Sequence, residues 1–254
     1  MTSRRTLGIL VGASLLTAVP AGAQRGPAPA PTGLPAEVLS LACAPTLTHV
    51  PPVETLHITG GQDATARRTY HPGDLITIGA GTRDNITVGQ QFFVRRTLVS
   101  RDEPITPKTP GIIRTAGWIQ VYAVDDAMSL ATIVHACDTV NVGDYLEPFA
   151  VPAVPTPKAE RPAAERENYA RVMMGQDRRR LFARGDYLTI DRGSNHGVSA
   201  GAHFVLYRDK HLGGNFLFEL GEAVVMTVSA DSATLQVTSS LDAIQEGDYA
   251  AMRR

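Results

Sequence analysis

The sequence predicts an all-β protein with two tandem copies of a small antiparallel β-barrel or sandwich module, joined by a Pro/Ala-rich linker. Three observations lead to this fold class. The stretch 73–96 recurs without a gap as 185–208. Both copies consist of short β-branched and aromatic runs, separated by clusters of Gly, Asn, Asp and Ser, which is typical of strands and turns. Strands at such close spacing favour a small barrel or sandwich.

The first 23 residues have the pattern of a secretory signal peptide. Arg4 and Arg5 precede an apolar run over 7–19, and Ala-Gly-Ala follows at 21–23. The segment SRRTLG at 3–8 also partly fits a twin-arginine signal, so two export routes are open. Either route predicts an exported protein that lies in the periplasm or is associated with the outer membrane. No later stretch is apolar enough to span a bilayer, so we expect no transmembrane segment in the mature chain.

Acidic and basic side chains nearly balance. The full sequence has 24 basic and 25 acidic side chains. Removal of Arg4 and Arg5 with the signal peptide would leave the acidic side chains in a small excess. This balance gives no electrostatic basis for binding nucleic acid or an anionic membrane surface. We therefore expect no nucleic-acid partner.

Residues 24–55 are predicted to be a Pro/Ala-rich tether and an N-terminal segment that contains Cys43. The second cysteine is Cys137. Two cysteines in an exported protein predict a disulfide between them. Two alternatives are a lipoprotein site at Ser-Leu-Ala-Cys, 40–43, and free thiols. A free Cys137 beside His135 would resemble a reactive Cys–His pair.

The repeat divides the remainder of the chain into module 1 (56–148), a linker (149–167) and module 2 (168–254). Several turn and core residues are identical in the two copies: Gly81, Gly89, Phe92 and Arg96 recur as Gly193, Gly201, Phe204 and Arg208. The connector after the repeated stretch is longer in module 1. The linker is rich in proline and alanine without an apolar period, which indicates a semi-rigid spacer. A helical period is visible only over 164–174.

Gly-Asp occurs before an apolar stretch four times, at Gly73-Asp74, Gly143-Asp144, Gly185-Asp186 and Gly247-Asp248. His71-Pro72-Gly73-Asp74 fits a type II turn, in which the glycine needs a positive φ. The aspartate can accept backbone N–H groups where the strand begins. We therefore predict that all four pairs are structural turns. The Arg-Gly-Asp tripeptide at 184–186 occupies the same turn position, so we do not interpret it as an integrin ligand.

The spacing of glycines and apolar residues in module 2, followed by LGEAVV (220–225), SAT (232–234) and GDY (247–249), resembles the C-terminal β-barrel domain of flagellar assembly protein T. Similar domains follow LysM modules in bacterial envelope proteins. The resemblance implies a β-barrel in a scaffold of the periplasm or outer membrane, and it brings no catalytic residues.

The sequence predicts no catalytic, cofactor or metal site. The stretch DRGSNHG at 191–197 contains Asp, Ser and His, but the aligned loop 79–85 lacks Ser and His, so we interpret it as a turn. The remaining histidines have no metal-ligand spacing: His57, His71, His196 and His203. Two segments are candidates for contact with a partner, namely the basic run 178–184 and the connector 97–117.

Together these features favour a non-enzymatic, exported scaffold or adaptor of the cell envelope, associated with the outer membrane or the flagellum. The alternative is a protein that binds peptidoglycan or another envelope glycan. That function needs an exposed aromatic platform, for which Trp118, Tyr122 and Phe216 are the candidates. The expected partner is an envelope protein or peptidoglycan.

Overall fold

The computed structural model describes residues 33–63, 67–99, 104–106, 108–165, 167–175, 179–211 and 216–254. The predicted signal peptide lies outside these ranges, and so does part of each candidate contact segment. None of the helices in the described ranges is both long and apolar enough to cross a membrane. The fold is all-β, which confirms the predicted class.

Most strands before the linker form one seven-stranded antiparallel sheet, here called the first sheet. Its main path has the order β2-β4-β7-β6-β5-β9, and β1 is added on β6. The strands are β1 (Thr46–Thr48), β2 (Ile58–Gly61), β4 (Leu75–Ile78), β5 (Gln91–Leu98), β6 (Gly111–Val124), β7 (Ser129–Ala136) and β9 (Tyr145–Pro148). A β-bridge between His57 and Tyr145 joins the two ends of the path. The short strands β3 (Thr69–Tyr70) and β8 (Val140–Asn141) pair separately.

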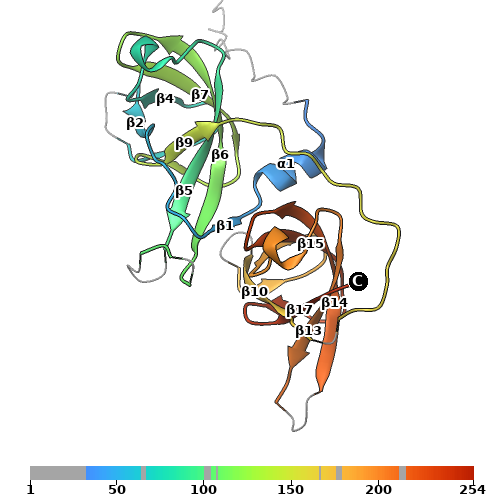
Figure 1. The fold of residues 1–254 in the computed structure, drawn as a ribbon. Coiled ribbons are helices and arrows are strands. Elements are labelled where there is room, and N and C mark those ends of the chain that lie inside the picture. Colours follow the sequence, from blue (N-terminus) through green and yellow to red (C-terminus); the bar gives the residue numbers. More distant parts are fainter. Residues whose placement is uncertain are drawn as a thin grey trace, which may run out of the picture. The chain divides into compact units, whose positions relative to one another are not determined.

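The strands after the linker close into a six-stranded antiparallel barrel with the order β10-β12-β15-β14-β13-β17. Its strands are β10 (Ala170–Gly175), β12 (Tyr187–Ile190), β13 (His203–Asp209), β14 (Leu217–Val228), β15 (Ala233–Ser240) and β17 (Tyr249–Met252). The pair β11 (Leu181–Phe182) and β16 (Ile244–Gln245) repeats the arrangement of β3 and β8. Figure 1 shows the barrel strands in orange and red.

Each sheet encloses its own apolar core. Ile78 and Phe92 are buried in the first sheet, and their repeat counterparts Ile190 and Phe204 are buried in the barrel. Short 3₁₀ helices after β4 and β12, Thr82–Asp84 and Ser194–His196, also correspond. The alternation of apolar residues in the strands therefore builds the same framework twice.

The helical period over 164–174 is misleading, because the only α-helix of the described residues lies elsewhere. Residues 170–175 form β10, which closes the barrel between β12 and β17. The helix is α1 (Ala36–Ala42), which lies within the predicted tether. Its seven residues are too few to produce a clear apolar period, so the sequence pattern does not reveal it.

The connector 97–117 is also more regular than predicted. Strand β5 continues to Leu98 and β6 begins at Gly111, so both ends of the connector belong to an extended hairpin. Strand β1 pairs with β6 along this extension, with Leu47 opposite Ile112. Strand β1 therefore occupies the edge of the first residues of β6, while most of the additional length of module 1 lies between β5 and β6, over 99–110.

The linker contacts the barrel. Lys158 N donates to Gly201 O at 2.9 Å, and its own carbonyl bonds to His203 Nε2 at 2.8 Å. Further along, the Arg253 side chain donates to Pro162 O at 3.0 Å. These hydrogen bonds hold the extended linker to the barrel surface.

Candidate functional site

All four Gly-Asp pairs form the same turn. The glycines have φ values of 89°, 91°, 92° and 88° at Gly73, Gly143, Gly185 and Gly247. In each turn the aspartate amide donates to the carbonyl three residues earlier, at 3.0–3.2 Å, which closes a β-turn. The aspartate carboxylate also accepts the amide of that earlier residue at 2.7–2.9 Å. The motif is therefore closed by one backbone and one side-chain hydrogen bond.

An arginine binds the second turn of each copy. Arg96 forms two hydrogen bonds with the Asp144 carboxylate, at 2.7 and 2.8 Å, and a third with Thr139 O at 3.0 Å. Arg208 makes the equivalent contacts with Asp248, at 2.8 and 2.7 Å, and with Ala243 O at 2.8 Å. We call these two pairs the arginine clamps.

The clamps are buried structural ion pairs. Asp144 and Asp248 are only 4% and 3% exposed. Hydrogen bonding to these carboxylates raises the pKa of Arg96 and Arg208 above the ordinary arginine value. A bidentate geometry of this kind is among the stronger charged hydrogen bonds. The alignment of the two copies shows that Arg96 and Arg208 occupy the same position, but it does not show which residues they bind.

Cys43 and Cys137 form a disulfide, with 5.5 Å between their Cα atoms, and this confirms the predicted pairing. Cys137 follows β7, and Cys43 follows α1. The bond leaves neither sulfur as a thiol, although His135 lies nearby. The His135 ring stacks on Trp118 at 4.3 Å, and burial lowers its pKa.

The segment 36–48 also contacts the barrel. Leu41 and Ala44 pack in an apolar cluster with residues of β12 and β14: Tyr187, Val224 and Met226. Thr234 Oγ1 donates to Pro45 O at 2.9 Å. The segment is thus bonded to Cys137 at one point and packed on the barrel at another.

In the stretch 191–197 the Asp and His side chains each bind a backbone amide. The Asp191 carboxylate accepts the Arg171 amide at 2.7 Å, and His196 Nδ1 accepts the Gly193 amide at 3.3 Å. Within the described residues, the one cluster of potential metal ligands is Cys43, His135 and Cys137, whose two sulfurs are bonded to each other.

Two of the three aromatic candidates are exposed. Trp118 is 1% exposed and packs against Phe93 and Phe149, so it belongs to the core. Tyr122 in β6 is 67% exposed, and Phe216 before β14 is 70% exposed.

In the basic run 178–184, Arg179 pairs with Asp186 at 3.1 Å and Phe182 is buried.

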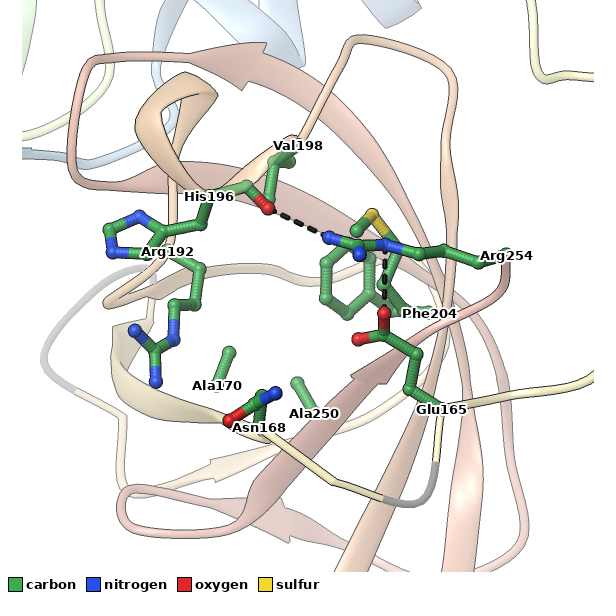
Figure 2. A pocket seen from close by; sticks show the side chains of 10 residues that line it. Glu165, Asn168, Ala170, Arg192, His196, Val198, Phe204, Ala250 and Arg254 are labelled. Atoms are coloured by element: carbon green, nitrogen blue, oxygen red, sulfur yellow. Dashed lines mark hydrogen bonds and ion pairs between the residues drawn. The ribbon is translucent and has the colours of Figure 1, made fainter.

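The feature that sequence reasoning missed is a pocket of about 300 Å³ in the barrel. Its floor is apolar and consists of Ala170, Val198, Phe204, Ala250 and Met252. Its polar lining consists of Glu165, Asn168, Arg192, His196 and Arg254. In Figure 2, Arg192 lies on one side of the opening and the Arg254–Glu165 pair on the other. Arg254 binds Glu165 at 2.8 Å and His196 O at 2.9 Å.

The corresponding place in the first sheet is lined differently. In the barrel Arg171 pairs with Tyr249, and in the first sheet His57 pairs with Tyr145. The residue before Arg171 is Ala170, and the residue before His57 is Leu56, so these two correspond. The residues after the two tyrosines, Ala250 and Leu146, correspond in the same way. The two leucines also meet, since Leu146 N donates to Leu56 O at 2.9 Å. Both pack on the core of the first sheet.

Arg192 also has an apolar counterpart. In the repeat alignment it corresponds to Ala80, which is buried in the first sheet. The pocket is therefore a place where two copies of one framework differ in chemistry. An alignment of the copies contains this difference, but only the strand register shows that the altered positions surround one cavity.

No protein-family model matches the chain, and no curated protein matches it.

Proposed function

We propose that this chain is a non-enzymatic, exported scaffold or adaptor of the cell envelope. The observation that carries the proposal is the duplicated arginine clamp. The charged residues shared by both copies bind one another and the backbone, so they support the framework and are not positioned to react with a substrate. The parts that differ between the copies are then the parts available for partners.

The disulfide supports the proposed location. A disulfide between Cys43 and Cys137 is typical of proteins that fold in an oxidising compartment such as the periplasm. The resemblance of module 2 to the barrel of flagellar assembly protein T directs the search for a partner to the outer membrane and the flagellum.

The proposal is tested by affinity purification of the tagged full chain from solubilised envelope membranes, followed by quantitative mass spectrometry. We expect one or a few envelope proteins to be enriched after the peptidoglycan has been digested. Recovery of no protein above the tag control would contradict the adaptor function.

Binding of peptidoglycan or another envelope glycan is the second candidate, because Tyr122 and Phe216 are exposed aromatic side chains that could stack on sugar rings. Co-sedimentation of the purified chain with cell-wall sacculi tests it. Loss of sedimentation in Tyr122→Ala or Phe216→Ala, with Leu241→Ala as an exposed non-aromatic control, would favour the glycan function over the adaptor function.

A further inference from the structure

We propose that the barrel pocket binds the free C-terminal residue of a peptide, a carboxylate that carries a small aliphatic side chain. Binding at this site can be measured with the purified protein alone, so its test does not depend on whether the adaptor proposal is correct. Three features of the pocket carry the inference: an arginine without a counter-charge, an apolar floor, and the different lining of the first sheet.

The first feature is Arg192, which follows β12 and lines the pocket. Its Nε is buried and has no hydrogen-bond partner among the described residues. A buried donor without a partner is costly, and a guanidinium binds a carboxylate through two parallel hydrogen bonds. Arg192 lines the pocket and has no ion pair among the described residues, so the Nη groups of its guanidinium are the donors available to a carboxylate there.

The other charges of the pocket limit the ligand to a single negative charge. Arg254 is already paired with Glu165, as Figure 2 shows, and it also donates to His196 O. Only Arg192 is left without a counter-charge among the described lining residues. The Glu165 carboxylate would repel a second negative charge, which disfavours phosphates and polyanions.

The second feature is the floor. Ala170, Val198, Phe204, Ala250 and Met252 are all buried members of the barrel core. They offer an apolar surface close to the charged rim, so the favoured ligand has an apolar group next to its charge. A volume of about 300 Å³ is at the lower limit of ligand pockets, and it suits one residue better than a long chain.

The third feature is the comparison within the chain. The first sheet places Leu56, Leu146 and Ala80 where the barrel has Ala170, Ala250 and Arg192. A cavity and a buried donor that has no partner among the described residues both reduce stability. Since the first sheet carries two leucines and an alanine at the corresponding positions, we infer that the barrel retains its own lining for a ligand.

The test is isothermal titration of the full chain with the acetylated dipeptide acetyl-Ala-Leu, as the free acid and as the C-terminal amide. We expect the acid to bind and the amide to bind at least tenfold more weakly, because the amide has no charge for Arg192. A parallel titration with acetyl-D-Ala-D-Ala distinguishes the two sources of such a carboxylate. Preference for the L peptide indicates a protein C-terminus, and preference for the D peptide indicates a cell-wall stem peptide.

Variants locate the binding in the pocket. Arg192→Met should weaken binding of the preferred acid about tenfold to a hundredfold, the value of a charged hydrogen bond. Arg184→Met, an exposed arginine at the turn before β12, should leave Kd unchanged. Ala250→Leu restores the side chain of the first sheet and should block the pocket while every charge is retained.

Several outcomes would overturn the proposal. These are equal affinity for acid and amide, unchanged affinity in Arg192→Met, or absence of heat from both peptides at millimolar concentration. If Arg192→Met does not fold, as judged by circular dichroism, Ala250→Leu decides the question, since the first sheet accommodates leucine at this position.

Discussion

At each Gly-Asp turn one glycine adopts a backbone conformation that other residues avoid. Gly185 has a φ of 92°, and no heavy atom outside its chain neighbours lies within 4 Å of the place where a Cβ would stand. The requirement for glycine therefore comes from the backbone and not from crowding. The two neighbours of Gly185 have other roles. The Asp186 carboxylate accepts a hydrogen bond from the Ala183 amide, whereas Arg184 is exposed.

We therefore expect an order of effects at this turn. Gly185→Val should lower the free energy of unfolding by about 1–2 kcal/mol, the cost of a side chain in the left-handed region. Asp186→Ala should cost about 1 kcal/mol through the lost bond to the Ala183 amide. Arg184→Ala should change it by less than about 0.5 kcal/mol. Chemical denaturation, with hydrogen exchange of β12 amides as a local readout, measures all three. A larger effect for Arg184→Ala than for Gly185→Val would contradict the structural interpretation of this tripeptide.

The arginine clamps allow a second prediction at the residue scale. Arg208→Met leaves the Asp248 carboxylate buried without its cation, so it should destabilise the barrel by about 3 kcal/mol. Arg83→Met is the matched control. Arg83 forms its ion pair with Asp126 at 3.0 Å on the surface, where both side chains are largely exposed. The control should cost less than about 1 kcal/mol. If Arg208→Met and Arg83→Met lowered the stability equally in thermal denaturation, burial of the Asp248 carboxylate would not explain the contribution of the clamp.

At the scale of elements, the short helix α1 packs against both apolar clusters that lie outside the two main cores. Ala42 belongs to the cluster around Trp118, whereas Leu41 packs with Tyr187 of the barrel. Seven residues cannot form a stable helix alone, since helices of this length are marginal in water. The disulfide and the two apolar contacts therefore hold the helix in place.

The disulfide should contribute strongly to stability. It closes a loop over a sequence separation of 94 residues, for which chain entropy gives an upper value of about 4–5 kcal/mol. The double substitution Cys43→Ala with Cys137→Ala should lower the free energy of unfolding by an amount up to this value, measured by chemical denaturation. Wild-type protein under reducing conditions serves as the control and should behave like the variant. Equal stability of oxidised wild type and variant would contradict the expectation.

At the scale of the whole molecule, the two cores are separate clusters, and all six barrel strands lie between Ala170 and Met252. The hydrogen bonds that close the barrel are therefore local to module 2. The segment 36–48 contributes from outside this range, because Leu41 and Ala44 cover Tyr187 and its neighbours.

We expect residues 168–254 to fold alone, with a β-type circular dichroism spectrum and a cooperative melt. The melting temperature should be lower than that of the barrel in the full chain, because the fragment lacks the cover that Leu41 provides. Leu41→Ser in the full chain is the corresponding control and should shift the barrel transition in the same direction. A disordered fragment would mean that the barrel depends on the preceding residues.

The repeat, the turns and the disulfide were accessible from the sequence because each depends on local chemistry or on residue counting. The residues beside Gly73 and Gly185 indicate their turns, and two cysteines allow only one pairing within the chain. Strands were recognisable because their alternation has a period of two residues. The weak helical period over 164–174 does not correspond to a helix, because residues 170–175 form β10, which pairs with β12 and β17 in the barrel.

The contacts between distant residues were decided only by the tertiary structure. Arg208 meets Asp248 because β13 pairs with β17, and Leu41 meets Tyr187 because the disulfide and apolar packing hold α1. The pocket has the same origin. Arg192, Ala170 and Ala250 are far apart in the chain, and none has a distinctive neighbourhood in the sequence. Closure of the barrel brings them together, since strand register, and not residue type, determines which side chains share one end of its interior.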